Sequence, residues 1–210
     1  IKYNYNYGLR DGQGFNMRNN YYHKPIASLN WELKLNNKTS LSATAYASLG
    51  RGGGSGDLGR NGSYGFFSSS RWRNPDNGYV LWDEIVKHNS GQTANWRYGS
   101  TSMGIDASTG QYIVNDESFS SRSEYPRRNG WIQRNSVNSH NWFGAIANIK
   151  TELAENLTLD VGFDSRFYKG LHYRNVRDLL GSDGYRDSRY NGTPNTNGVV
   201  AATEEYKWPI

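Results

Sequence analysis

The residues of this chain best suited to binding a metal ion are its four histidines, His23, His88, His140 and His172. Two of them, His140 and His172, belong to a pair of segments whose alternating polarity allows a hairpin with Leu153 opposite Leu157. This pairing puts His140 opposite Gly170 and leaves His172 just beyond it, at the far end of the hairpin. Because imidazole is a common metal and haem ligand, a metal or haem site is one interpretation. Two separate, solvated histidines are the interpretation we favour, and we expect no cofactor.

Charged side chains on one face of the same hairpin could carry acid–base chemistry. The pairing puts Lys150 opposite Asp160, and Asp164 and Arg166 follow on the same face. A catalytic carboxylate pair, as in a glycosidase, is one interpretation. A polar wall held together by ion pairs is the interpretation we favour, because no Ser-His-Asp, HExxH or phosphate-loop pattern occurs in a usable context. We therefore expect no enzymatic activity.

Tryptophans in a long, amide-rich segment are the third group of candidate functional residues. Aromatic rings beside Asn, Asp and Arg suit a platform for sugars or other flat ligands. The alternative is that the rings pack the segment on itself. The candidate ligand-binding residues are Trp72, Trp82, Trp96 and Trp131, together with His140 and His172.

The composition excludes several classes of protein. Aromatic residues make up 14% of the 210 residues, which is too many for a disordered chain. The chain has no cysteine, so it has neither a disulfide scaffold nor a thiolate metal site. The net charge of +5 comes from scattered Lys and Arg, so we expect no nucleic-acid partner. No apolar run is long enough for a transmembrane helix.

Two pairs of segments alternate strictly between apolar and polar residues and predict long β-hairpins. The strands are expected at about 26–36, 39–50, 140–153 and 157–170, and the hairpins align when Leu35 is superposed on Leu153. A further strand is expected at about 1–9. The turns at 36–38 and 154–156 are short.

The segments between these strands are expected to be loops, at 10–25, 51–139 and 171–210. One helix is predicted within "NPDNGYVLWDEIVKHNSG" and a second short one at 175–180. Strands of about 10–14 residues are long for a soluble sandwich. Their apolar faces of Ala, Leu, Val and Phe, opposite polar faces, are typical of lipid-facing and lumen-facing sides of a membrane barrel. We therefore predict an all-β, antiparallel transmembrane barrel segment, with a soluble secreted β-sandwich that binds carbohydrate as the alternative.

Two stretches carry a resemblance to a known family. They are "NNYYHKPIASLNWELKLNNKTSLSATAYASLGRGGGSG" and "NSVNSHNWFGAIANIKTELAENLTLDVGFDSRFYKGLHYRNVRDLLGSDGYRD". Both resemble parts of the barrel of TonB-dependent outer-membrane receptors, most of all the SusC-like nutrient receptors. The resemblance implies import of an oligosaccharide, peptide or metal chelate across the outer membrane of a Gram-negative bacterium. It also implies outer-membrane lipid, a TonB-type energy-transducing complex and a SusD-like surface lipoprotein as partners.

The chain departs from that family in its extent. The family has a plug domain and a barrel of about 22 strands, whereas these residues carry no plug domain and only four or five expected strands. So few strands cannot close a barrel, and an open sheet edge is not tolerated in lipid. We therefore expect either that these residues are a piece of a longer chain or that other segments complete the edges of the sheet. The short turns are expected in the periplasm and the long segments outside the cell.

Overall fold

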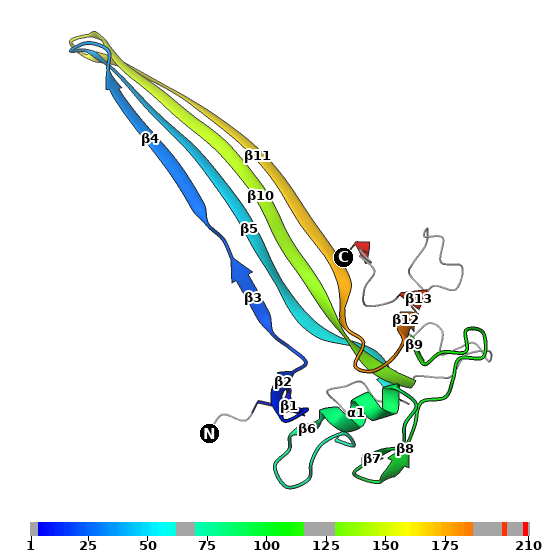
Figure 1. Ribbon diagram of the computed structural model, residues 1–210. Coiled ribbons are helices and arrows are strands. Elements are labelled where there is room, and N and C mark those ends of the chain that lie inside the picture. Colours follow the sequence, from blue (N-terminus) through cyan, green and yellow to red (C-terminus); the bar gives the residue numbers. More distant parts are fainter. Residues whose placement is uncertain (1–3, 62–69, 116–128, 187–198, 201–207, 210) are drawn as a thin grey trace. The chain divides into compact units, whose positions relative to one another are not determined.

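The computed structural model is mainly β, with long antiparallel strands and one helix (Figure 1). It describes residues 4–61, 70–115, 129–186, 199–200 and 208–209. By their contacts these residues form two units, which we call unit 1 (Ile1–Asn20, Gly54–Ser136 and Tyr173–Ile210) and unit 2 (Tyr21–Gly53 and Val137–His172). The elements in chain order are β1 (Tyr7–Arg10), β2 (Gln13–Asn16), β3 (Asn20–His23), β4 (Ile26–Lys34), β5 (Thr39–Asn61), β6 (Val80–Leu81), α1 (Trp82–Asn89), β7 (Ala94–Trp96), β8 (Gly99–Thr101), β9 (Ile113–Asn115), β10 (Asn129–Ala154), β11 (Leu157–Asp178), β12 (Gly184–Arg186), β13 (Val199–Val200) and β14 (Trp208–Pro209).

Unit 2 is a sheet of long strands lying side by side, with β11 next to β10, β10 next to β5, and β4 paired with β5 (Figure 1). The β4–β5 register puts Leu33 opposite Leu41 and Trp31 opposite Ala43, so the apolar residues of both strands share one face. The turn after β4 is closed by Asn36, whose side chain accepts a hydrogen bond from the amide of Lys38. Period-two alternation with a short polar link thus produces the hairpin that the sequence predicts.

Three strands extend much further than the alternation indicates. Strand β5 continues to Asn61, β10 begins at Asn129, and β11 continues to Asp178. The expectation of a continuous loop over 51–139 was therefore wrong at both ends, and the expected helix at 175–180 is replaced by the end of β11 and a turn.

The glycines that suggested a loop after residue 50 lie inside β5. An added Cβ would lie 2.3 Å from the His140 ring at Gly50 and 2.4 Å from the Tyr22 ring at Gly52. Each glycine therefore admits a bulky side chain from a neighbouring strand. Glycine within a strand often marks such a close approach rather than a turn.

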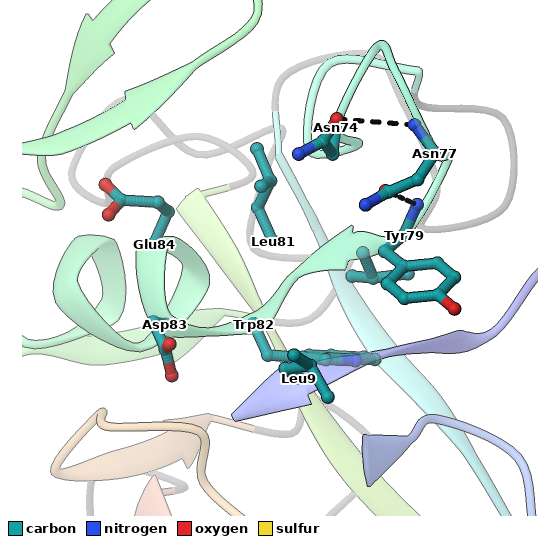
Figure 2. Close-up of a pocket in the computed structure, with 9 residues that line it drawn as sticks. Leu9, Asn74, Asn77, Tyr79, Leu81, Trp82, Asp83 and Glu84 are labelled. Carbon is teal, nitrogen blue, oxygen red and sulfur yellow. Dashed lines mark hydrogen bonds between the residues drawn. The ribbon is translucent and has the colours of Figure 1, made fainter. Parts of the chain in front are cut away.

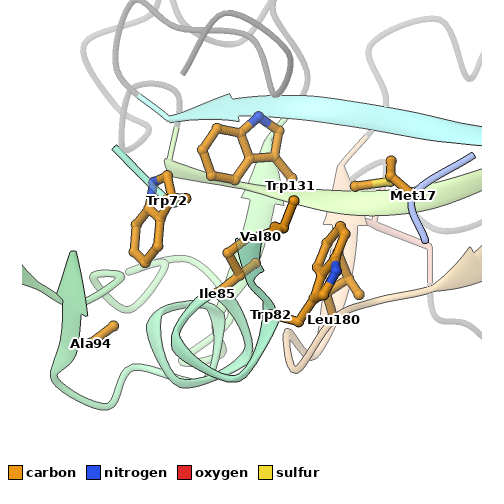
Figure 3. Packing of buried hydrophobic residues seen from close by; sticks show 8 residues of the cluster. All are labelled: Met17, Trp72, Val80, Trp82, Ile85, Ala94, Trp131 and Leu180. Atoms are coloured by element: carbon orange, nitrogen blue, oxygen red, sulfur yellow. The ribbon is translucent and has the colours of Figure 1, made fainter. Parts of the chain in front are cut away.

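In unit 1, both faces of the first part of β10 are buried. Trp131 of β10 packs in one cluster with residues of β6, α1 and β7 (Figure 3), and the next residue, Ile132, packs in a second cluster with Val114 and Tyr185. Small sheets frame these clusters, in the orders β2-β1-β6, β13-β12-β9 and β7-β8. Residues in a strand point alternately to its two faces, so this part of β10 forms the middle layer of a core.

The predicted helix is present as α1. Its first turn carries Asp83 and Glu84 and its last turn Lys87 and His88, an arrangement that matches the helix dipole. The helix ends where the amide of Gly91, at φ +75°, donates to the carbonyl of His88. Within the described ranges, no helix is long and apolar enough to cross a membrane.

The ends of the chain differ from the expected strand at 1–9 and the expected loops at 10–25 and 171–210. Residues 7–16 form the short β1–β2 hairpin, and β3 follows it. Strand β12 pairs in parallel with β9. Residues 1–3, 62–69, 116–128, 187–198, 201–207 and 210, on which parts of those expectations fall, lie outside the described residues.

Candidate functional site

Three of the four candidate tryptophans lie in the core of unit 1 rather than on a ligand platform. Trp72, Trp82 and Trp131 are 3%, 0% and 1% exposed (Figure 3). Trp72 contacts Trp131 edge to face, with ring centroids 6.0 Å apart. Burial places these three rings in the core, as in the alternative interpretation, packing of the segment on itself; Trp82 also lines the pocket described below.

Trp96 is the one candidate tryptophan that remains half-buried at the surface of unit 1. Its ring stacks on Trp72 at 6.2 Å, and the guanidinium of Arg71 lies 4.8 Å from the centroid of the Trp96 ring. A cation over an indole face is a stabilising contact in its own right. This contact occupies a face that a flat ligand would need.

The candidate histidines of unit 2 have separate surroundings. The His140 ring stacks on Tyr168, with centroids 5.8 Å apart, and its Nε2 lies 3.4 Å from the Ser48 hydroxyl. His172 is exposed and lies beside Gly170. The described residues contain no group of three or more His, Cys, Asp or Glu that could hold a metal ion.

The charged residues expected on the lumen-facing side pair locally along and between the strands of unit 2. The guanidinium of Arg166 is 2.6 Å from the carboxylate of Asp164, two residues away on β11. Asp160 accepts a hydrogen bond of 2.5 Å from Asn148 of β10, so Asn148 takes the role expected of Lys150. These pairs make a polar wall and leave no isolated carboxylate pair among them.

A pocket of about 250 Å³ in unit 1 has room for a small ligand (Figure 2). Tyr79 is 37% exposed at its mouth and contacts Tyr7 edge to face. The side chains of Asn74 and Asn77 accept hydrogen bonds from backbone amides in the turn before β6, which leaves their NH₂ groups as donors toward a ligand. The lining residues are Leu9, Asn74, Asn77, Tyr79, Val80, Leu81, Trp82, Asp83 and Glu84.

The two carboxylates of this pocket have structural partners. Asp83 accepts a hydrogen bond from the amide of Asp11. Burial alone would raise the pKa of Glu84, but hydrogen bonds from Lys87 and from the amide of Asn95 outweigh it and hold the pKa below its usual value. A general acid needs a raised pKa, so Glu84 is not suited to that role.

A buried ion pair supports unit 1 around β9 and β12. Arg186 donates to the carboxylate of Asp106, and both side chains are at most 2% exposed. Burial alone would raise the pKa of Asp106, but the hydrogen bonds from Arg186 and Ser108 and the charge of Arg186 lower it to about 2. Arg186 also donates to Asn115, so the pair fastens β12 to its neighbour β9.

Among the residues that line the pocket, Trp82 was a candidate ligand contact from the sequence, whereas neither residue of the buried pair was expected. Both the pocket and the pair join residues far apart in the chain: Leu9, from the expected strand at 1–9, with Tyr79, and Asp106 with Arg186, from two separate expected loops. The signal available was the turn pattern "NPDNG" before the helix, which does fix Asn74 and Asn77.

Comparison with known proteins gives little further guidance. No family model and no curated protein matches this chain. Among solved structures, the chain is similar to one described as the cryo-EM structure of the Gasdermin A3 membrane pore, with 8% identity and a TM-score of 0.23. The match covers 76% of this chain and 58% of that chain, so it spans less than two thirds of the other chain's length. At this TM-score a common fold is not established, and the function has to be argued from the residues of this chain itself.

Proposed function

We propose that this chain forms part of the transmembrane barrel wall of a TonB-dependent outer-membrane receptor of the SusC-like type. In this proposal the receptor imports a nutrient, such as an oligosaccharide, a peptide or a metal chelate. The observation that carries the proposal is the exposed apolar face of the long strands of unit 2. On it Leu29, Trp31 and Phe163 are 62%, 68% and 66% exposed.

The apolar face continues across all four long strands of unit 2. Exposed apolar residues at alternate positions line β4, β10 and β11, and small alanines line β5 between them. The shortest of these strands, β4, has nine residues. A strand of about 9–11 residues is enough to cross the apolar layer of a membrane, so each of the four is long enough.

The soluble sandwich is a weaker explanation of the same face. A soluble protein covers the apolar face of a sheet with a second layer, and apolar patches above a few hundred Å² are rare on monomers. Within the described part of unit 2 the apolar side chains of β4 and β11 remain open to their surroundings. Contact with lipid accounts for this exposure without a further layer.

The proposal assigns partners to the remaining surfaces. The outer edges of β4 and of β11 before its pairing with β14, which have no neighbouring strand among the described residues, would pair with further strands, because unpaired backbone groups are too costly in lipid. The long segments of unit 1, with the pocket, would lie outside the cell, because the short turns of the hairpins would lie in the periplasm. A plug domain would transmit force from the TonB-type complex, and a SusD-like lipoprotein would deliver ligand to the outer side.

A charge on the apolar face should therefore be far more damaging than the same charge on the neighbouring position. We expect Ala147→Arg to destabilise the protein folded in a bilayer by about 2–4 kcal/mol. Asn148→Arg, its matched control, points to the polar face near Asp160 and should cost much less. Refolding yield of the purified protein into lipid vesicles, followed by gel mobility with and without heating, measures both.

An equal yield for the two variants would contradict a lipid-facing Ala147. A protein that refolds fully in buffer without lipid or detergent would instead support the soluble sandwich.

A further inference from the structure

Aromatic rings gather on the polar face of unit 2. The His140 ring stacks on Tyr168, with centroids 5.8 Å apart, and the Tyr46 ring contacts Trp142 edge to face, with centroids 5.7 Å apart. His140 and Trp142 are two residues apart on β10, so they share one face of the sheet. Together with Tyr22 of β3, these residues form a group that we call the aromatic strip.

The strip is built into the sheet, because glycines leave the space that its rings occupy. At three glycines a Cβ would lie 2.2–2.4 Å from an atom of a strip side chain: Gly50 at His140, Gly52 at Tyr22 and Gly144 at Tyr46. Tyr46, Gly50 and Gly52 occupy even positions of β5, so they share one face of this strand. At about 3.4 Å per residue the strip runs for about 20 Å along the sheet, which is long enough for more than one ring-shaped group.

Two rings of the strip remain open to their surroundings. Tyr22 is 66% exposed and Tyr168 is 59% exposed. Tyr168 lies on the same face of β11 as Asp160 and Asp164, because all three occupy even positions of the strand. Lipid in the proposed orientation contacts the opposite face, so it does not account for these exposed rings. Packing against glycine accounts for the position of Tyr22 but leaves much of its surface uncovered.

The exposed rings offer the chemistry that binds a flat ring. An aromatic face stacks on another aromatic ring or on the apolar C–H face of a sugar ring. Polar groups lie beside the strip. The Ser48 hydroxyl is 3.4 Å from Nε2 of His140, and Nζ of Lys24 lies 5.4 Å from the centroid of the Trp142 ring. A ligand ring that stacks on the strip would therefore find hydrogen-bond partners at its edges.

We propose that the aromatic strip binds a ligand through flat rings, which are either sugar rings or aromatic rings. This inference rests on the proposed function, in which the polar face lines the path of the imported nutrient. It narrows that function, because a nutrient without flat rings would make no use of Tyr22 and Tyr168. It also places the ring-binding surface on the strands of unit 2 and not on the buried tryptophans of unit 1.

The test uses the purified protein refolded into lipid vesicles and two probes, maltotetraose for sugar rings and catechol for an aromatic ring. Sorbitol, which has the hydroxyl groups of a sugar but no ring, is the control. Saturation-transfer NMR detects contact of each probe with the protein, and a titration gives its affinity. We expect the protein to bind maltotetraose or catechol more tightly than sorbitol. The probe that binds more tightly identifies the kind of ring.

Tyr168→Leu should weaken the binding of that probe about fivefold, the effect of losing one stacking contact. Tyr22→Leu should have a similar effect. The matched control is Phe167→Leu, at the neighbouring residue of β11, whose ring is 67% exposed on the opposite, apolar face; it should bind like the original protein. Tyr168→Phe keeps the ring and should also bind like the original protein.

Equal binding by Tyr168→Leu, Tyr22→Leu and the original protein would overturn the site. A lower melting temperature of the two leucine variants with no loss of binding would show that the rings only cover the glycines. Refolding into vesicles tests the proposed function separately. A protein that enters vesicles normally but binds neither probe more tightly than sorbitol would reject this inference and leave the membrane proposal standing.

Discussion

Trp82→Ala should destabilise unit 1 by about 3–5 kcal/mol, the usual effect of removing a large buried aromatic side chain. Trp82 is fully buried and contacts Phe15 edge to face, with ring centroids 4.8 Å apart. The ring also packs beside Val80 and Leu180 (Figure 3), so its loss leaves a cavity that several elements would have to fill. Urea unfolding followed by tryptophan fluorescence measures the change.

The control for this substitution is Tyr79→Ala, at an exposed ring three residues earlier in the chain. It should change stability by less than about 1 kcal/mol but should weaken the binding of any ligand that occupies the adjoining pocket. If Trp82→Ala left stability unchanged and abolished ligand binding, Trp82 would be a ligand contact after all.

Arg186→Met should cost about 3–5 kcal/mol, because it leaves the buried carboxylate of Asp106 without its partner. The double variant that adds Asp106→Leu should recover much of this loss, since a buried ion pair can often be replaced by apolar side chains of similar volume. A double variant no more stable than Arg186→Met would show that the hydrogen bonds to Asn115 and Ser108, and not the ion pair, hold this region together.

The same pair predicts how stability depends on pH. The pKa of Asp106 in the folded protein is about 2, below the value of about 3.9 for an unfolded aspartate. Its contribution is therefore complete above about pH 4 and is lost as the pH falls from about 4 to about 2. Urea midpoints across this range should fall more steeply for the original protein than for the double variant. Parallel curves would contradict the lowered pKa.

The hairpins of unit 2 were predictable because one face of each strand is apolar and the other polar. Successive side chains of a strand point to opposite faces of the sheet, so a period of two, as in "IASLNWELKLN", shows which residues share a face. The short turns fix the register of the hairpins. The extensions of the strands were not predictable in the same way. Around Gly50 to Gly56 the alternation disappears, because the residues that fill the face come from neighbouring strands.

The candidate ligand site was predicted less well than the sheet. The segment around Trp82 and Trp131 has the composition of a sugar-binding platform, but both side chains are buried in a core. Composition alone does not distinguish a platform from a core.

The central claim, that one face of unit 2 contacts lipid, can be tested directly because the chain has no cysteine. Single cysteines can replace Ala45, Ala147, Val161 and Phe163 on the apolar face, and Thr44, Asn148, Asp160 and Asp164 on the polar face. With spin labels on the protein in lipid vesicles, power saturation compares access of oxygen, which concentrates in lipid, with access of a water-soluble nickel chelate. The account predicts that the first four labels respond to oxygen and the second four to nickel, alternating residue by residue along each strand. Nickel access at all eight positions would contradict it.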